Sequence, residues 1–310
     1  MVVKVRNLVK RYKELIALDH FNMEVEEGEI LGLLGPNGCG KTTAINCILS
    51  LLSFDKGEVE VFGRKMTPDA YDIKQKIGLV PQEVSVFENL TVRENVDYFC
   101  GLYVDDKHLR RRYVDEAIEF VGLKDYVKFY PKKLSGGLKR RLNIACGIAH
   151  KPKLIFLDEP TVAVDAQSRN FILNGIKELN KEGSTIIYTT HYLEEAEMLC
   201  KRIVIMDNGK DLVSGSKEEL KAMITTSEKV VVSFTSISDE ELSEMKGLPH
   251  VIDIERDGEE YIIKFESGIN NLTKLLEFIK EKELIYTKLH SQLPTLNDVF
   301  LELTGKELRD

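Results

Sequence analysis

The stretch Gly35-Pro36-Asn37-Gly38-Cys39-Gly40-Lys41-Thr42-Thr43 decides the fold of this chain. It follows the apolar run Ile30 to Leu34 and leads into a helix-like segment, Ala44 to Leu52. The pattern G-x-x-x-x-G-K-[ST] between a strand and a helix is that of a phosphate-binding loop. Glycines let successive backbone N–H groups curl around a phosphate, because they carry no Cβ that would clash. The stretch therefore predicts a site for a nucleoside triphosphate.

The side chains of this loop predict how the nucleotide is held. Lys41 is expected to reach the β- and γ-phosphates, and the Thr42 hydroxyl to bind Mg²⁺. Cys39 lies at a helix N-terminus, where a thiol pKa can be lowered, but we favour an ordinary small side chain at this position. The remaining residues expected to line the phosphates are Gly35, Asn37, Gly38, Gly40 and Thr43.

Length and composition set the class of protein. The 310 residues suffice for one large domain and one small one, and the hydrophobic fraction of 43% is that of a soluble protein. No apolar run approaches the ~18 residues of a membrane-spanning helix, and the sequence shows no signal segment at Met1. Five scattered cysteines without a C-x-x-C pair indicate reduced thiols in a cytosolic compartment, not disulfides or a zinc site.

The net charge of −8 is unevenly distributed along the chain. From Ile224 onward there are 18 acidic and 10 basic residues, so this tail carries the whole excess. An acidic tail is expected to avoid nucleic acid and anionic lipid headgroups. Because no basic patch interleaved with aromatic residues is present, we expect no nucleic-acid partner.

Apolar runs and helical periods alternate after the loop, which predicts a parallel sheet covered on both faces. The region between Gln82 and Leu154 is mostly helical and predicts a helical subdomain of about residues 83–150, inserted between two strands. Val2 to Glu26 predicts antiparallel strands broken near Lys13. The expected strands of the parallel sheet are Ile30–Leu34, Leu154–Asp158, Thr185–Thr190 and Ile203–Met206, and the expected helices are Leu90–Tyr103, Lys107–Val121 and Leu138–Ala149.

Beyond about Met223 the pattern changes, which divides the chain into domains of residues 1–222 and 223–310. The second domain has the order β-α-β-β-α-β, so we expect a small ferredoxin-like fold with a hairpin turn at Asp257-Gly258. Its expected strands are Lys229–Phe234, Val251–Arg256, Tyr261–Phe265 and Leu284–Leu289, and its helices are Glu240–Lys246, Leu272–Lys282 and a last one from Thr295 to Leu303.

Polar residues at strand ends predict the catalytic groups. The strand Leu154–Asp158 ends in two acids: Asp158 is placed to hold Mg²⁺ opposite Thr42, and Glu159 to orient or deprotonate an attacking water. His191 follows the strand Thr185–Thr190, on the ligand side of a parallel sheet, where it can bond the γ-phosphate. Gln82 follows Leu79-Val80-Pro81 and can sense Mg²⁺ and the water.

A second anion site is predicted at Leu134-Ser135-Gly136-Gly137, which opens a helix with unpaired N–H groups. One chain with one triphosphate needs only one such site, whereas two chains arranged head to tail can each clamp the phosphate held by the other. The alternative is an N-cap Ser135 and a turn. Tyr12 can stack on adenine or be an exposed hairpin residue, and Asp165 can cross a dimer interface or cap a helix.

Together these motifs resemble ABC-type ATPases in order and spacing, over about Met1 to Met223. The segment Pro294 to Gly305 is similar to the C-terminus of ATP-binding subunits from bacterial drug and sodium exporters, including the daunorubicin-resistance type. The resemblance implies an α/β fold of the P-loop NTPase type. It also implies that Tyr12 stacks on adenine, Glu159 is the catalytic base and His191 the switch histidine.

Three residues depart from the pattern of that family. Leu138 stands where the signature usually has Gln, although exporters of this type often carry an apolar residue there. Ala163 and Ala166 replace the Gly and Pro that are usual around Asp165. A more constrained backbone at Ala163 is expected to alter how two sites communicate.

The resemblance implies an ATP-hydrolysing subunit of a membrane exporter, using ATP and Mg²⁺. We expect a homodimer that sandwiches two ATP molecules and works with separate permease subunits, at the cytoplasmic face of the membrane and without a membrane span of its own. The alternatives are an importer ATPase, a soluble ABC-type ATPase of translation, repair or chromosome complexes, and an interaction protein with a dead site.

Overall fold

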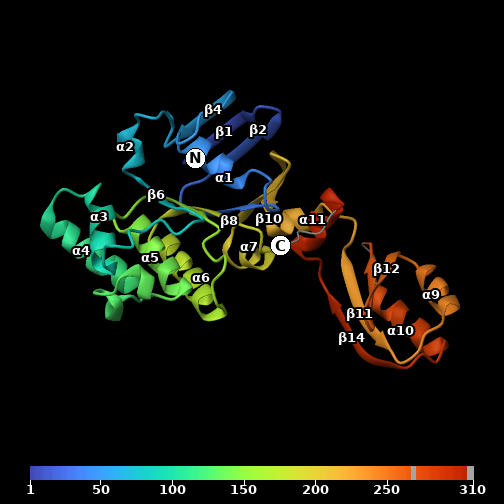
Figure 1. Cartoon of the computed structure of the whole chain (residues 1–310). Coiled ribbons are helices and arrows are strands. Elements are labelled where there is room, and N and C mark those ends of the chain that lie inside the picture. Colours follow the sequence, from blue (N-terminus) through green and yellow to red (C-terminus); the bar gives the residue numbers. More distant parts are fainter. Residues whose placement is uncertain (267–269, 306–310) are drawn as a thin grey trace. The chain divides into compact units, whose positions relative to one another are not determined.

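The computed structural model describes residues 1–266 and 270–305. The chain divides into two compact units, one from Met1 to Ser216 and one that begins at Lys217 (Figure 1). The predicted division at 222/223 falls at the end of a helix, α8 (Lys217–Ala222), which belongs to the second unit.

The first unit is built on a six-stranded sheet with the order β10-β9-β3-β8-β7-β6. Neighbouring strands from β9 to β6 run parallel, and β10 pairs antiparallel with β9. Three central strands are buried along their whole length, which confirms the prediction of strands covered on both faces. The strands are β3 (Ile30–Leu34), β6 (Ile77–Val80), β7 (Leu154–Asp158), β8 (Thr185–Thr190), β9 (Arg202–Asp207) and β10 (Lys210–Ser216).

A second sheet of the first unit is antiparallel, with the order β2-β1-β4-β5. Its first two strands confirm the antiparallel pair predicted for the start of the chain, and the break lies at Lys13, whose φ is +53°. The strands are β1 (Val3–Tyr12), β2 (Leu15–Val25), β4 (Lys56–Val61) and β5 (Arg64–Lys65).

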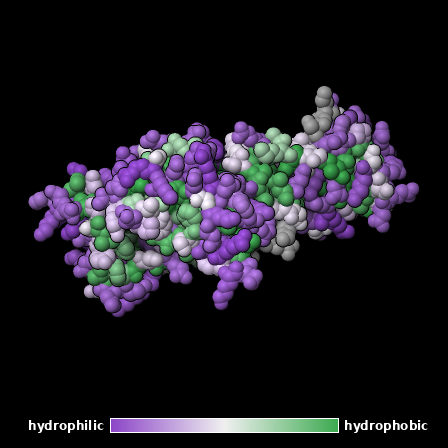
Figure 2. Space-filling model, turned by 90° about the horizontal axis from the view of Figure 1, so that it is seen from above, coloured by the Kyte–Doolittle hydropathy of each residue, from purple (hydrophilic) through white to green (hydrophobic). Residues whose placement is uncertain are grey.

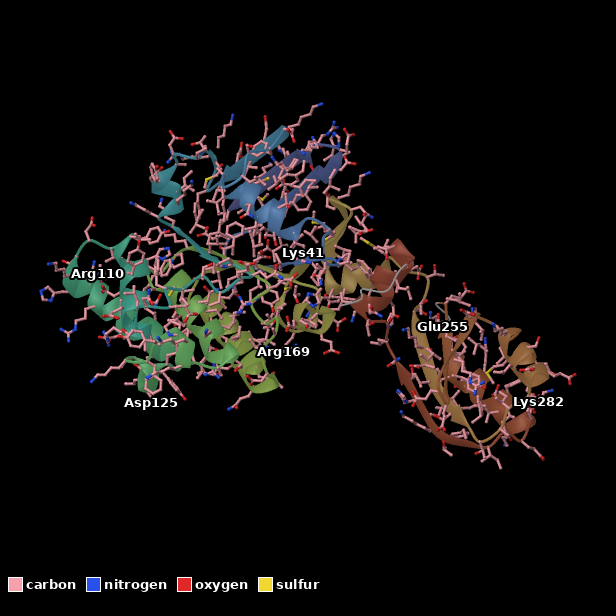
Figure 3. All side chains as sticks on the ribbon, in the orientation of Figure 1. Lys41, Arg110, Asp125, Arg169, Glu255 and Lys282 are labelled. Atoms are coloured by element: carbon pink, nitrogen blue, oxygen red, sulfur yellow. The ribbon has the colours of Figure 1, made fainter. Side chains whose placement is uncertain are left out.

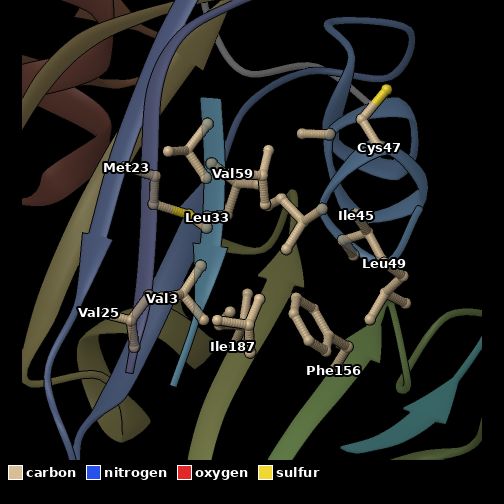
Figure 4. Close-up of a cluster of buried hydrophobic side chains, with 14 of the residues drawn as sticks. Val3, Met23, Val25, Leu33, Ile45, Cys47, Leu49, Val59, Phe156 and Ile187 are labelled. Atoms are coloured by element: carbon tan, nitrogen blue, oxygen red, sulfur yellow. The ribbon is translucent and has the colours of Figure 1, made fainter. Parts of the chain in front are cut away.

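Helix α1 (Lys41–Ile48) packs with both sheets in one hydrophobic core (Figure 4). Leu33, Phe156 and Ile187 of the large sheet and Val59 of the small one belong to this core. The predicted helix from Ala44 to Leu52 was wrong at both ends. Gly40, with a φ of +111°, turns the chain directly into the helix at Lys41, and the left-handed Ser50, at +51°, follows its end.

Three helices between β6 and β7 confirm the predicted helical region and lie together in Figure 1. Their first residues follow side-chain caps, as expected for Ser, Thr and Asp: Thr91, Asp106 and Ser135. They are α3 (Val92–Gly101), α4 (Lys107–Phe120) and α5 (Gly136–Ile148), with short 3₁₀ turns at Lys124–Tyr126 and Pro131–Lys133, and the short α2 (Tyr71–Lys74) precedes β6.

Two further helices of the first unit flank β8. Helix α6 (Ala166–Lys181) was not predicted, although its buried residues Ile172, Ile176 and Leu179 recur at helical spacing after the cap Asp165. Helix α7 (Leu193–Leu199) follows β8 after His191 and Tyr192. Both helices pack against each other, and α6 also packs against α5.

The second unit confirms the predicted β-α-β-β-α-β order. Its antiparallel sheet has the order β12-β13-β11-β14, with α9 and α10 on one face over a common core (Figure 1). The strand predicted from Leu284 begins only at Tyr286, because the N–H of Leu284 bonds the carbonyl of Ile279 and closes α10. The elements are β11 (Glu228–Phe234), α9 (Asp239–Lys246), β12 (Val251–Asp257), β13 (Glu260–Phe265), α10 (Asn271–Glu281), β14 (Tyr286–Gln292) and α11 (Leu296–Thr304).

The surface is mostly polar on the face that Figure 2 shows, where hydrophobic residues form separate patches. Within residues 1–266 and 270–305, no helix combines the length and the apolar character that a membrane crossing requires.

Candidate active site

The phosphate-binding loop connects β3 to α1, and its backbone requires glycine. Gly38 and Gly40 have φ values of +80° and +111°, in the region that side-chain-bearing residues rarely adopt. A Cβ on Gly35 would lie 2.2 Å from the carbonyl oxygen of Met206, so no larger residue fits there. Asn37 and Gly38 are exposed at the tip of the loop. The loop therefore has the conformation that the sequence pattern predicts.

Cys39 points into the protein. It is buried, its carbonyl accepts a hydrogen bond from the Gly209 N–H at 2.9 Å, and its sulfur would lie 2.6 Å from a Cβ on Gly35. Burial raises the pKa of the Cys39 thiol, and this outweighs the nearby Lys41 ammonium. The favoured prediction, an ordinary small side chain, is confirmed, and the alternative of a thiol pKa lowered by the helix N-terminus is wrong.

Lys41 begins α1 and is buried at the end of the loop (Figure 3). Its ammonium donates to the carbonyl oxygens of Gly35 at 2.8 Å and Pro36 at 3.2 Å, and lies 3.1 Å from Oε1 of Glu159. The loop itself thus orients the lysine towards the acidic end of β7. The next two residues follow in the first turn, with Thr42 exposed and Thr43 half-buried.

Asp158 lies directly opposite Thr42 at the end of β7. Its Oδ2 accepts from the Thr42 hydroxyl at 2.7 Å, and its Oδ1 accepts from the Thr189 hydroxyl at 2.6 Å. Carboxylate and hydroxyl oxygens are the ligands that Mg²⁺ prefers, usually with phosphate oxygens completing its shell. The described residues contain no cluster of three or more His, Cys, Asp or Glu that would hold a metal by itself. The pair therefore fits a Mg²⁺ ion that arrives with a nucleotide.

Three predicted site residues converge on Glu159. Lys41 Nζ contacts one carboxylate oxygen, and the other lies 3.3 Å from Gln82 Nε2 and 3.3 Å from His191 Nδ1. The backbone N–H of Glu159 donates to the Thr189 hydroxyl at 2.9 Å. Glu159 itself has a φ of +46°, a conformation that costs roughly 1–3 kcal/mol and tends to occur at functional sites. Its side chain is only 5% exposed, so these contacts act in a low dielectric.

The second predicted anion site lies at the start of α5. Ser135 caps the helix by accepting from the Leu138 N–H at 3.3 Å. A Cβ on Gly137 would lie 2.2 Å from the hydroxyl of Ser168, which shows how closely α5 approaches α6, whereas a Cβ on Gly136 would lie 3.8 Å from the carbonyl oxygen of Ala163, an ordinary contact. Among the hydrogen bonds of the described residues, none joins Ser135, Gly136 or Gly137 to the phosphate-binding loop.

Asp165 lies beside this second site. It caps α6 by accepting from the N–H of Ser168 at 2.8 Å and from its hydroxyl at 2.9 Å. These hydrogen bonds hold the pKa of the exposed Asp165 carboxyl below its usual value. In this single chain the structure thus shows the helix-capping alternative for both Ser135 and Asp165, and both side chains lie close to the α5–α6 contact.

Tyr12 is the last residue of β1, where it pairs with Leu15 at the hairpin. Its ring is 46% exposed, and the Lys10 ammonium lies 5.0 Å from the ring centroid. The neighbouring strand β2 borders the phosphate-binding loop, because a Cβ on Gly40 would lie 2.6 Å from the carbonyl oxygen of Ala17. An aromatic face is therefore available at the hairpin of the strands that border the loop.

Sequence reasoning missed a buried carboxylate behind the site. One oxygen of Glu195 accepts from the hydroxyls of Tyr188 at 2.6 Å, Thr161 at 2.9 Å and Thr190 at 3.0 Å, and the other lies 3.5 Å from Arg169 Nε. Burial and the Glu195 carboxylate raise the pKa of Tyr188 well above its ordinary value. Glu195 thus connects the segment after Glu159 to the strand before His191. Its sequence context, a Glu-Glu pair on a short helix, did not indicate that it would be buried.

Comparisons with known proteins identify the family of this chain. Residues 18–162 match the model of the ABC transporter family, and residues 215–304 match that of the C-terminal domain of DrrA1-3-like ATP-binding proteins. The chain is 36% identical to the linearmycin resistance ATP-binding protein LnrL of Bacillus subtilis (strain 168), over 100% of both chains. It is 32% identical to the daunorubicin resistance ATP-binding protein DrrA3 of Streptomyces coeruleorubidus, over 97% of this chain and 95% of that one.

A solved structure shares the fold of the first unit. It is the dimeric structure of a post-hydrolysis state of an ATP-binding cassette bound to ADP and Pi. The TM-score is 0.64 at 30% sequence identity, and the match covers 69% of this chain and 98% of that one. The fold predicted from the sequence, an ABC-type ATP-binding domain with an added ferredoxin-like domain, is confirmed.

The chain belongs to the ATP-binding proteins of the ABC transporter family. It is an ATPase of the drug-exporter type, which powers transport across a membrane. The importer and soluble alternatives are not favoured, because relatives over its full length are drug-resistance and Nod factor export ATP-binding proteins.

Proposed function

We propose that this ATPase works as a dimer in which two ATP molecules lie between the phosphate-binding loop of one copy and Ser135-Gly136-Gly137 of the other. The convergence of Lys41, Gln82 and His191 on Glu159, next to the Thr42–Asp158 pair, carries this proposal. This cluster supplies the groups that the proposed hydrolysis needs on one side of the nucleotide. Among the described residues, no hydrogen bond joins the second anion site to that cluster, which fits a site that acts on the nucleotide of a second copy.

In the proposed mechanism the γ-phosphate takes the place of Glu159 beside Lys41. Both are anionic partners of one buried ammonium, so binding of ATP releases the Glu159 carboxylate. Glu159 then accepts a proton from a water molecule, the water oxygen bonds to the γ-phosphorus, and the bond to the β-phosphate oxygen breaks to give ADP and phosphate. His191 and Gln82 bond the γ-phosphate and the water, and Tyr12 stacks on adenine.

Mg²⁺, when bound, neutralises charge on the β- and γ-phosphates. We propose that Thr42, Asp158 and Gln82 hold it, with Thr189 fixing Asp158 through the hydrogen bond to Oδ1. The phosphates are cradled by the loop residues Gly35, Asn37, Gly38, Cys39, Gly40 and Thr43, and Asp165 faces the partner copy.

A groove beside the Gln82 segment is the proposed contact for a separate permease. Its volume is about 390 Å³, and it is lined mainly by apolar side chains, among them Leu79, Phe99, Leu102 and Tyr103. Because it also includes Pro81 and Ser85, a permease segment seated there would contact the residues that flank Gln82. We place the protein at the cytoplasmic face of the membrane, attached through that permease.

The proposed domain roles follow from these positions. Residues 1–216, with a helical subdomain at about 83–150, form the ATP-binding domain. The unit that begins at Lys217 forms an accessory domain, and the acidic excess from Ile224 onward favours an orientation away from anionic lipid.

The dimer is tested with Glu159→Gln. The change keeps the shape of the side chain but removes the base, so kcat is expected to fall at least about 100-fold while ATP stays bound. Light scattering after size exclusion should then report a dimer with ATP and Mg²⁺ and a monomer without them. Glu194→Gln, at an exposed position on α7, is the matched control and should behave as the wild type.

A Glu159→Gln variant that stays monomeric at saturating ATP, with the permease present, contradicts the sandwich. The membrane partner is tested separately by gentle solubilisation of the tagged chain from membranes. A stoichiometric membrane protein with several spans is expected. Soluble partners or ribosomes alone would contradict the permease contact.

A further inference from the structure

Helix α5 carries a buried arginine, Arg140, that takes no part in the proposed hydrolytic steps. Arg140 is 5% exposed. Its two terminal nitrogens donate to consecutive backbone carbonyls, Pro81 at 3.1 Å and Gln82 at 2.6 Å. Burial lowers the pKa of Arg140, and the nearby carboxylates of Asp158 and Glu159 oppose that effect. Burying a guanidinium costs free energy unless its hydrogen bonds are made. The bonds to these two carbonyls therefore stabilise Arg140 in its buried position, and the question is what this contact does.

The same face of α5 holds the Gln82 segment at two further points. One turn after Arg140, the Asn143 amide donates to the Pro81 carbonyl at 3.2 Å and accepts from the Ser85 N–H at 3.0 Å. One turn further on, a Cβ on Gly147 would lie 2.9 Å from the carbonyl oxygen of Leu79. The backbones approach closely at this point, so α5 and the segment from Leu79 to Ser85 are attached over about two turns of the helix, from Arg140 to Gly147.

This attachment joins the two halves of the proposed site. Ser135 and the two glycines begin α5, five residues before Arg140. At the other end, the Gln82 side chain reaches the Glu159 carboxylate at 3.3 Å. A shift of α5 is therefore passed to Gln82 through its own backbone carbonyl.

We propose that Arg140 is a positioning residue that makes the start of α5 and Gln82 move as one body. When Ser135-Gly136-Gly137 engages the ATP of the partner copy, Arg140 sets Gln82 against Glu159 and the Mg²⁺ site of its own copy. The inference rests on the proposed ATP sandwich. Arginine suits the task because its planar fork holds two carbonyls at once, whereas lysine presents a single ammonium.

The test compares Arg140→Gln and Arg140→Lys with Arg141→Gln in the full-length chain. Arg141 is the matched control, because its guanidinium lies 4.1 Å from the ring centroid of Phe171 and away from the Gln82 segment. The measurements are kcat and KM for ATP, affinity for a fluorescent ATP analogue, and the melting temperature. Arg140→Gln is expected to lower kcat roughly 10- to 100-fold, since misplaced catalytic groups cost rates of this order.

The phosphate-binding loop is unchanged in these variants, so KM and analogue affinity should stay near wild-type values. Arg140→Lys should fall between Arg140→Gln and the wild type. Equal kcat values for Arg140→Gln and Arg141→Gln would overturn the inference. A parallel loss of kcat, affinity and melting temperature in both Arg140 variants would overturn it too, because it indicates a purely structural role.

If Arg140→Gln does not fold, the kcat of Arg140→Lys relative to the wild type and Arg141→Gln tests the inference. Failure of the proposed function has a different signature. In that case the wild-type chain does not hydrolyse ATP, or Glu159→Gln does not dimerise, whatever residue stands at position 140.

Discussion

The charged side chains at the carboxyl edge of the six-stranded sheet and those on the sheet of the second unit differ in how far they are buried. At the carboxyl edge, Asp158, Glu159, His191 and Glu195 are all less than 9% exposed and contact one another or nearby hydroxyls. On the sheet of the second unit, charged residues form ion pairs at the surface, such as Lys288 with Glu260. The carboxyl edge buries its charges, whereas pairs such as Lys288 with Glu260 remain in water. The pair of Lys229 with Asp298 is a buried exception in the second unit.

Buried charges at the carboxyl edge are suited to chemistry, whereas exposed charges on the second unit favour solubility. A buried carboxylate costs several kcal/mol of desolvation and is retained only where partners satisfy it. Surface pairs contribute little, because water and salt screen them. The carboxyl edge is therefore expected to lose stability and activity together on substitution, whereas the exposed ion pairs of the second unit should tolerate loss of a charge.

The largest effect on stability is expected from Glu195→Ala. It leaves the hydroxyls of Tyr188, Thr161 and Thr190 without their shared acceptor, and Arg169 without its carboxylate. The free energy of unfolding should fall by about 3–5 kcal/mol, the usual cost of removing one partner from a buried ionic contact. Urea unfolding followed by circular dichroism measures this.

The control for that variant is Glu194→Ala, one residue earlier on α7 and exposed. Its free energy of unfolding should change by no more than about 0.5 kcal/mol. Equal losses in the two variants would contradict the view that the Glu195 cluster stabilises this edge.

A smaller effect of opposite sign is expected from Ala163→Gly. Ala163 has a φ of +58°, in the left-handed region that costs a residue with a Cβ about 1–2 kcal/mol. Glycine adopts this conformation freely but loses more entropy on folding. The net gain in the free energy of unfolding should be about 0.5–1 kcal/mol, measured by urea unfolding.

Ala166→Gly is the matched control for that gain. Ala166 begins α6, where glycine costs about 0.5–1 kcal/mol relative to alanine, so this variant should be less stable. A loss of stability in Ala163→Gly comparable to that of Ala166→Gly would refute the assignment of strain to the loop before Asp165.

The smallest effect is expected from Lys288→Ala in the second unit. Lys288 and Glu260 are 57% and 34% exposed, so water and salt screen their ion pair and it contributes little to stability. Thermal unfolding of the full chain at low and at 1 M salt measures it, and the difference from wild type should shrink as salt rises. A loss of several kcal/mol would remove the contrast between the two regions.

Local patterns allowed much of this architecture to be predicted. Asp158 ends the buried strand β7 and Glu159 follows it, while Lys41 and Thr42 begin the helix after the loop that follows β3. Parallel strands bring such ends together at one edge of a sheet. The alternation in the second unit likewise predicted its strands, because one face is covered by helices and the other faces water.

The rest depends on contacts between distant segments. Nothing near Arg140 indicates that its guanidinium is buried against Pro81 and Gln82, nearly sixty residues earlier. Glu195 follows another glutamate and has the pattern of a solvated helix, yet tertiary packing buries it. The start of α1 was misplaced for a different reason, since the left-handed Gly40 lets a helix begin within the loop itself.

The most direct test of the account is a structure of Glu159→Gln with ATP and Mg²⁺. The account predicts a dimer in which each γ-phosphate lies between Lys41 of one copy and Ser135 of the other. Gln82 and Asp158 should lie at the metal, with Arg140 still on the Gln82 carbonyl. A structure in which each ATP contacts residues of only one copy would contradict it.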